Sequence, residues 1–167
     1  MFYTIADDLI FYQLIRFIRK YSNSELKLYQ YFYSKTNGIY PEFVIIIGKY
    51  IFFFVNNKYY FNTKKYLDSM RREVRSKKIL IVRVENVFIR LLFSLFPDLY
   101  IHDIALEFDN SSGQKKITIF FLTFKERRIA IGRGAEYIRT VNKLFNKYII
   151  FENEYTPIEI ECKSIIN

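Results

Sequence analysis

The stretch that decides the fold is Ile129-Ala-Ile-Gly-Arg-Gly-Ala-Glu-Tyr-Ile138. Gly132 and Gly134 flank Arg133, so the backbone there can adopt dihedral angles closed to other residues and can approach a sugar-phosphate chain closely. A turn rich in backbone amides at the start of a helix, with an arginine at its tip, suits an anionic backbone. The stretch therefore predicts a short apolar run, a glycine turn and a helix that together bind a polyanion.

The helix predicted after this turn, over Ala135 to Lys147, has one apolar side and one basic side. Its apolar residues recur at helical spacing and predict a buried face: Ile138, Val141, Leu144, Phe145 and Tyr148. Cations follow at four-residue steps on the opposite side: Arg139, Lys143 and Lys147. Arg127 and Arg128 precede the turn, so cations bracket it on both sides.

Hydrophobic periodicity, capping residues and turn residues predict the other elements. Helices are expected over Thr4–Lys20, Ser24–Tyr33, Asn62–Arg75 and Asn86–Phe96. Strands are expected over Phe43–Ile47, Tyr50–Val55, Ile79–Val84, Tyr100–Phe108, Lys115–Phe124, around Ile149 and over Ile158–Cys162. The first two strands are apolar throughout, which predicts burial on both faces by this chain or by a partner.

These elements predict an α+β fold. From Asn86 onward the order is helix-strand-strand-helix-helix-strand, with Ile129–Ile131 as the short first helix of the pair. That is the order of a type II KH domain (α-β-β-α-α-β), in which a Gly-x-x-Gly loop clamps a few nucleotides. Here Ala135 stands where that loop usually ends in glycine. We expect an α/β N-terminal extension with two helices and a hairpin at residues 1–55, a linking segment with a basic helix and a strand at 56–85, and a KH-like RNA-binding domain at 86–167.

Positive charge is concentrated in two segments of the chain, whose formal net charge is +9. Residues 58–83 and 115–147 each carry nine Lys or Arg against two acidic residues, a net charge of +7 in each segment. The rest of the chain is net −5. Such clustering favours a polyanionic partner over a merely solvated surface.

The sequence predicts no enzyme, no cofactor and no metal site. His102 is the single histidine and Cys162 the single cysteine, so neither a nucleophile-base pair nor a cysteine-based zinc cluster can be assembled. Acidic residues gather near the C-terminus at Glu152, Glu154, Glu159 and Glu161, and we interpret them as a solvated edge, with a carboxylate metal site as the alternative. The most apolar run, Phe43–Val55, falls well short of the ~20 residues of a membrane span.

Two motifs resemble the small-subunit ribosomal protein S-three family, the KH-containing protein of the ribosomal head. One is Ile129-Ala-Ile-Gly-Arg-Gly-Ala-Glu-Tyr-Ile138 after the strand Lys116-Ile-Thr-Ile-Phe120, which resembles that family's strand, short connection and Ile-Gly-basic loop. The other is Tyr59-Tyr-Phe-Asn-Thr-Lys-Lys-Tyr66, which resembles its aromatic, Asn-Thr-Lys, aromatic segment before the KH module. The resemblance covers residues 56 to 167 and leaves residues 1–41 unexplained.

The resemblance implies a structural constituent of the small ribosomal subunit that binds rRNA in the head, near the site where mRNA enters, and supports translation. The implied partners are small-subunit rRNA, neighbouring ribosomal proteins, a separate chain carrying the family's second domain, and mRNA. Phosphates of the RNA would be bound by these residues: Lys64, Arg71, Arg72, Arg75, Arg127, Arg128, Gly132, Arg133, Gly134, Arg139 and Lys143. Abundant Phe, Tyr, Ile, Lys and Asn are typical of an AT-rich genome, which indicates a mitochondrial protein, with plastid or cytoplasm as alternatives.

A second family shares the glycine loop. The transcription factor NusA contains KH modules in tandem, and Glu25–Val55 can be interpreted as the start of a first, degenerate module. Tyr60–Thr63 lacks a glycine loop, so we rank NusA second. Tyrosines expected to be exposed favour a permanent assembly over a separate factor: Tyr29, Tyr31, Tyr33, Tyr59 and Tyr60.

Overall fold

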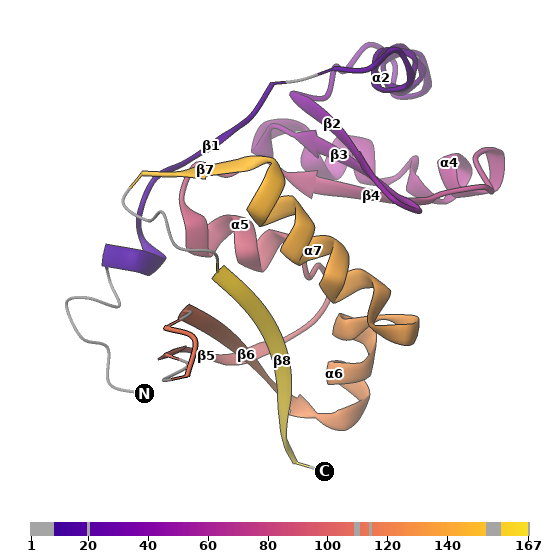
Figure 1. Ribbon diagram of the computed structural model, residues 1–167. Helices are drawn as coiled ribbons and strands as arrows, with labels where there is room; N and C mark the ends of the chain where they lie inside the picture. The colour runs from indigo at the N-terminus through magenta and orange to yellow at the C-terminus, as the bar shows by residue number, and fades with distance from the viewer. Residues whose placement is uncertain (1–8, 20, 109–110, 114, 153–157, 167) are drawn as a thin grey trace. The chain divides into compact units, whose positions relative to one another are not determined.

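The computed structural model describes residues 9–19, 21–108, 111–113, 115–152 and 158–166. The chain forms two compact units. Unit 1 combines residues 1–18 with residues 86–167, and unit 2 comprises residues 19–85. Figure 1 labels most of the helices and strands of both units.

Unit 2 is a three-stranded sheet with helices before and after its hairpin. Its elements are α2 (Asn23–Lys35), β2 (Phe43–Ile47), β3 (Tyr50–Val55), the 3-10 helix η1 (Asn57–Tyr59), α3 (Tyr60–Lys64), α4 (Leu67–Glu73) and β4 (Lys78–Arg83). β2 and β3 pair antiparallel, and β4 joins β3 in parallel, which gives the strand order β2-β3-β4. The two helices α3 and α4 supply the crossover that a parallel pair requires.

Local sequence accounts for the ends of these elements and for their burial. Ser22 and Glu25 form a reciprocal capping box that starts α2, because the Ser22 hydroxyl accepts from the Glu25 amide (3.3 Å) and the Glu25 carboxylate accepts from the Ser22 amide (2.9 Å). All six residues of β3 are buried, as its apolar sequence predicts. The core of unit 2 joins residues from α2, the sheet, α3 and α4: Phe32, Val44, Ile51, Phe53, Val55, Tyr60, Met70, Ile79 and Ile81.

Several expectations for unit 2 are corrected by the structure. The helix expected over Asn62–Arg75 is two helices, α3 and α4, which are joined by a turn at Lys65 and Tyr66. The helical region also starts earlier, since the Asn56 side chain accepts from the Lys58 amide at 2.9 Å and caps η1. Tyr60, expected at the surface, is buried.

The expected division at residues 55 and 56 also differs from the structure. Every residue of β4 pairs with β3, from Tyr50 opposite Lys78 to Val55 opposite Arg83. The hairpin and the supposed linking segment therefore share one sheet and belong to one unit.

Unit 1 contains two sheets. Its elements are β1 (Ile15–Phe17), α5 (Phe88–Ser94), β5 (Ile101–Phe108), β6 (Lys115–Thr123), α6 (Phe124–Ile131), the 3-10 turn η2 (Arg133–Ala135), α7 (Glu136–Lys147), β7 (Ile149–Phe151) and β8 (Ile158–Ile166). The larger sheet has the order β5-β6-β8, with β5 antiparallel and β8 parallel to β6. The smaller sheet is an antiparallel pair of β1 and β7.

Aromatic contacts tie the helices of unit 1 to one another and to the sheet. The Phe88 ring of α5 lies 5.3 Å from Phe145 of α7 and 5.2 Å from Phe151 of β7, centroid to centroid. Phe96 contacts both Phe121 of β6 and Tyr137 of α7. Each of these pairs is tilted or edge-on, the arrangement that aromatic quadrupoles favour.

The N-terminal helix expected over Thr4–Lys20 is wrong in its second half. Residues 1–8 lie outside the described part, residues 9–11 are helical, and Ile15–Phe17 form β1. β1 is a strand because it pairs with β7, over a hundred residues later, and tertiary pairing outweighs the local helical pattern. Two smaller corrections are that α5 begins at Phe88 rather than Asn86 and that the first helix of the pair has eight residues rather than three.

The fold class is therefore α+β, as the sequence predicts. None of the helices in the described segments is long and apolar enough to cross a membrane.

Candidate nucleic-acid interface

α6 begins at a second reciprocal capping box. The Thr123 hydroxyl accepts from the Glu126 amide at 3.3 Å, and the Glu126 carboxylate accepts from the Thr123 amide at 3.4 Å. Thr-x-x-Glu is the sequence signature of this start. The strand β6 thus passes into α6 without a loop, and the helix carries its residues directly to the glycine turn.

The turn between α6 and α7 has a positive φ at three of its four positions. Gly132 has φ 81° and ψ 169°, Gly134 has φ 61°, and Ala135 has φ 59°. The Gly132 amide donates to Arg128 O and the Ala135 amide donates to Gly132 O, both at 3.1 Å. A Cβ atom on Gly132 would lie 2.8 Å from Tyr137 Cβ, whereas one on Gly134 would meet open space.

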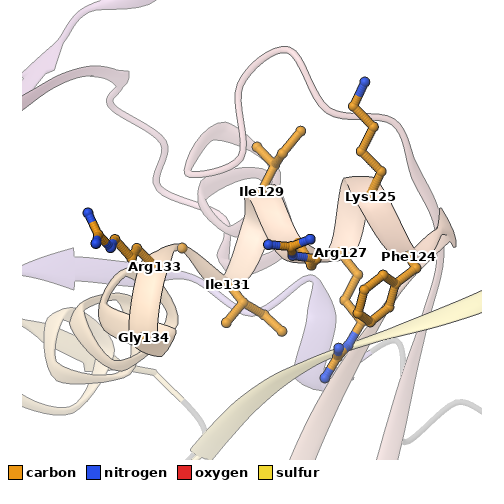
Figure 2. Close-up of a pocket in the computed structure, with 9 residues that line it drawn as sticks. Phe124, Lys125, Arg127, Ile129, Ile131, Arg133 and Gly134 are labelled. Atoms are coloured by element: carbon orange, nitrogen blue, oxygen red, sulfur yellow. The ribbon is translucent and has the colours of Figure 1, made fainter.

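α6 and this turn line an open groove of about 760 Å³. We call it the groove, and it is lined by Phe124, Lys125, Arg127, Arg128, Ile129, Ile131, Gly132, Arg133 and Gly134. Figure 2 shows Lys125 and Arg133 at opposite ends of this lining, with Ile129 and Ile131 between them. Phe124 is 48% exposed and Ile129 57% exposed, so apolar surface lies in the groove beside the cations.

The groove has a strong excess of positive charge. It contains four cations, Lys125, Arg127, Arg128 and Arg133, and the carboxylate of α6, Glu126, accepts from the backbone at the start of the helix. Cations next to exposed apolar and aromatic side chains suit a chain that presents phosphates on one side and bases on the other.

Arg127 also holds α6 against the sheet. Its Nε donates to Cys162 O of β8 at 2.9 Å. Burial raises the pKa of the Cys162 thiol to about 12, so this thiol stays protonated at neutral pH. Through its hydrogen bond to Cys162 O, Arg127 positions α6 on β8 in addition to lining the groove.

α7 has the two sides that its sequence predicts. Ile138, Val141, Leu144 and Phe145 are buried, and the basic stripe of Arg139, Lys143 and Lys147 is exposed. Asn142 fixes the helix on β8: its side-chain amide donates to Ile160 O at 3.0 Å and its carbonyl oxygen accepts from the Ile160 amide at 2.7 Å.

The predicted residues Lys64, Arg71, Arg72 and Arg75 lie in unit 2 and are not part of the groove. Arg71 donates from Nε and Nη2 to Ile79 O, at 3.2 and 3.1 Å, so it fastens α4 to β4. Arg75 donates to Arg72 O at 3.2 Å. These contacts give Arg71 and Arg75 structural roles that exposure and charge alone did not predict.

The sequence did not single out four groove residues: Phe124, Lys125, Ile129 and Ile131. The sequence pattern places Phe124 at the end of a strand and the two isoleucines in the short first helix of the pair. A signal was present in Thr123-x-x-Glu126, because a helix that starts at Phe124 turns Lys125 and Ile129, four residues apart, to one side.

Two of the acidic residues near the C-terminus have separate partners, and Glu159 is exposed. Glu152 accepts from the Leu14 amide at 3.3 Å, and Glu161 pairs with Lys116 and Lys163 at 3.1 and 3.2 Å, while Glu154 lies outside the described residues. Within the described ranges no three His, Cys, Asp or Glu side chains gather as metal ligands would. His102 is exposed on β5 and its ring contacts Tyr100.

Replacing Glu161 with glutamine should lower the free energy of unfolding by about 1 kcal/mol at pH 7. Burial raises the pKa of Glu161, but hydrogen bonds from Lys116 and Lys163 outweigh it and hold the pKa below its usual value. Because the folded-state pKa is depressed, this stabilisation is present above the unfolded-state pKa of roughly 4.3 and is lost as the pH falls through the folded-state value. Urea unfolding between pH 7 and pH 3 should show the two curves converging in acid, and a constant gap would contradict this account.

Comparison with known proteins identifies a fold and no family. No family model matches the chain, and no curated protein matches it. Among the solved structures that match, the crystal structure of APE1850 superposes with a TM-score of 0.59 at 18% identity, over 86% of this chain and 100% of that chain. At this level of identity the likeness concerns the fold alone.

Proposed function

We propose that this chain is an RNA-binding protein, without catalytic activity, whose unit 1 is a type II KH module. The observation that carries the proposal is the groove. Four cations and exposed apolar side chains lie there beside the glycine turn that leads from α6 into α7. The order α5-β5-β6-α6-α7-β8, with the third strand parallel to the second, supports the type II assignment. The short strand β7 between α7 and β8 is an addition to that order.

The ligand of the groove is a single strand rather than a duplex. The groove is about 760 Å³, and its exposed apolar side chains, Phe124 and Ile129, offer contact to unstacked bases, which a duplex does not present. The glycine turn allows the close approach of one phosphate backbone.

A direct binding measurement tests this proposal. Fluorescence anisotropy of the whole chain with a labelled 20-nucleotide RNA should give an affinity that falls steeply with salt and that a hairpin duplex of equal length does not match. Equal affinity for the duplex, or an affinity insensitive to salt, would contradict a single-stranded groove.

Two processes use such a module. The first is translation, with the chain as a constituent of the small ribosomal subunit, bound to rRNA and neighbouring proteins, in a mitochondrion. The second is transcription, with the chain as a NusA-like factor that binds nascent RNA. One observation favours the second: unit 2 has the order α2-β2-β3-α3-α4-β4, with β2 antiparallel and β4 parallel to β3, so the unit 1 topology occurs twice in tandem.

Fractionation separates the two processes. A lysate of the native source, or of its purified mitochondria, is sedimented through a high-salt sucrose gradient, and this chain is followed beside small-subunit rRNA and RNA polymerase. Migration with the rRNA supports the ribosomal proposal. Migration with the polymerase, or as a free protein, supports the transcription factor and removes the ribosomal one.

A further inference from the structure

Unit 2 carries a surface that corresponds by topology to the groove of unit 1. In each unit the helix pair follows the second strand and leads to a third strand parallel to it, so α3 and α4 correspond to α6 and α7, and β4 corresponds to β8. Arg71 of α4 donates to Ile79 O of β4, as Asn142 of the corresponding helix α7 donates to Ile160 O of β8.

The turn in unit 2 differs in kind from the glycine turn. Lys65 has φ −62° and Tyr66 has φ −91°, which are ordinary right-handed values. The Tyr66 amide donates to Thr63 O and the Met70 amide to Tyr66 O, so this turn is hydrogen-bonded like a continuing helix, and it contains no glycine. We therefore do not expect this turn to bind a phosphate through its backbone amides.

Aromatic rings and cations occupy the corresponding surface instead. Phe61 of α3 is 71% exposed, the largest exposed fraction among the large hydrophobic side chains that the structure describes. The Arg83 guanidinium of β4 lies 5.2 Å from the Phe61 ring centroid and 4.3 Å from that of Tyr60. Lys64 lies 5.6 Å from the Tyr60 centroid, and Lys58 lies 5.5 Å from that of Tyr59.

The charge of this surface indicates what covers Phe61. Lys58, Lys64, Lys65 and Arg83 are cations, and the nearby carboxylate, Glu85, accepts from the Asn57 side chain at 3.1 Å. An exposed ring among cations suits a nucleotide, because the base stacks on the ring while its phosphates meet the cations. An apolar protein partner would leave these cations desolvated.

We propose that unit 2 holds a second single-stranded RNA site, in which an unpaired base stacks on Phe61 and adjoining phosphates contact Lys58, Lys64 and Arg83. The proposal rests on the proposed function of unit 1 and extends it. The two units bind by different chemistry: unit 1 through a glycine turn and an apolar groove, unit 2 through ring stacking without a glycine turn. Stacking of this kind is tolerant of sequence, because every base has a flat face.

The test uses the whole chain and a 20-nucleotide uridine oligomer. Phe61→Ala should weaken binding about tenfold, while Phe61→Tyr should bind like the native chain because it retains a ring. Tyr40→Ala is the matched control, since Tyr40 is 58% exposed and stacks on Tyr33. Replacing single uridines with 5-iodouridine and irradiating the complex should cross-link RNA to the peptide that contains Phe61. Thermal unfolding of each variant checks that the exposed substitutions leave the fold intact.

A variant whose groove is disabled tests the site on unit 2 separately from the groove. In the double variant Arg128→Glu with Arg133→Glu, which disables the groove, Phe61→Ala should still weaken the remaining binding. Unchanged binding by Phe61→Ala in both backgrounds, or an equal loss with Tyr40→Ala, would overturn the second site and leave the groove standing. Self-association that Phe61→Ala abolishes would also overturn it, because the ring would then face protein. If the double variant binds like the native chain, the proposed function of unit 1 fails, whatever Phe61 does.

Discussion

Replacing Arg128 and Arg133 together with glutamate is expected to weaken binding of single-stranded RNA about a hundredfold at 0.1 M salt. Both side chains are exposed and line the groove, and Arg133 stands at the tip of the turn. Each phosphate contact with a single strand contributes about 0.7 to the slope of log affinity against log salt, so losing two lowers the slope by about 1.4. Repulsion between the new carboxylates and the phosphates adds to the loss.

The measurement is fluorescence anisotropy with labelled RNA from 50 to 500 mM salt. A matched control reverses two exposed cations that lie in unit 2 and outside the groove, Lys27→Glu with Lys49→Glu, and changes the net charge equally. It should weaken binding by only a few fold. An equal loss in both double variants would mean that the net charge of the molecule, and not the groove, binds the RNA.

Gly132→Ala is expected to lower the free energy of unfolding of unit 1 by about 3 kcal/mol. At φ 81° and ψ 169° Gly132 adopts a conformation that side chains rarely take. Its new Cβ would lie 2.8 Å from Tyr137 Cβ and 3.1 Å from Tyr137 N. Tyr137 cannot give way easily, because it is buried, its hydroxyl donates to Leu95 O and its ring packs on Phe96.

Two neighbouring substitutions in the turn serve as controls in urea unfolding. Gly134→Ala meets open space and carries only the cost of a left-handed residue, about 1 kcal/mol. Ala135→Gly should stabilise the chain by up to about 1 kcal/mol, because Ala135 itself is left-handed at φ 59°. An equal effect of the two Gly→Ala changes would show that the contact with Tyr137 is not decisive.

Elements with strong local signals could be predicted from the sequence. The strands Phe43–Ile47 and Tyr50–Val55 are found with the expected bounds, and the buried face of α7 is the expected one. Continuous apolar runs and a four-residue repeat of cations are local properties, so a single sequence displays them.

Features that depend on distant pairing could not be predicted. β1 follows from its pairing with β7, and the roles of Arg71 and Arg127 follow from carbonyl groups on strands that come later in the chain. A basic residue on a helix looks the same in the sequence whether it faces solvent or fastens a strand.

The repeated topology is only partly visible in the sequence, where Glu25–Val55 can be interpreted as the start of a first, degenerate module. The glycine turn of unit 1 is its one conspicuous motif, and unit 2 has Lys65 and Tyr66 at the corresponding position. Strand order and direction are backbone properties, so two units can share them without sharing a motif.

The interruption of unit 1 by unit 2 affects the order in which the chain can fold during its synthesis. Residues 19–85 contain every strand and helix of unit 2, so that unit can fold once Glu85 has left the ribosome. The residues of β1, Ile15–Phe17, are synthesised earlier but pair with Ile149–Phe151, so β1 cannot pair with β7 until nearly the whole chain has been synthesised. The nascent chain therefore carries Ile15 and Phe17 without their partner strand while unit 2 folds, and a chaperone that shields residues 15–17 should raise the yield of the folded protein.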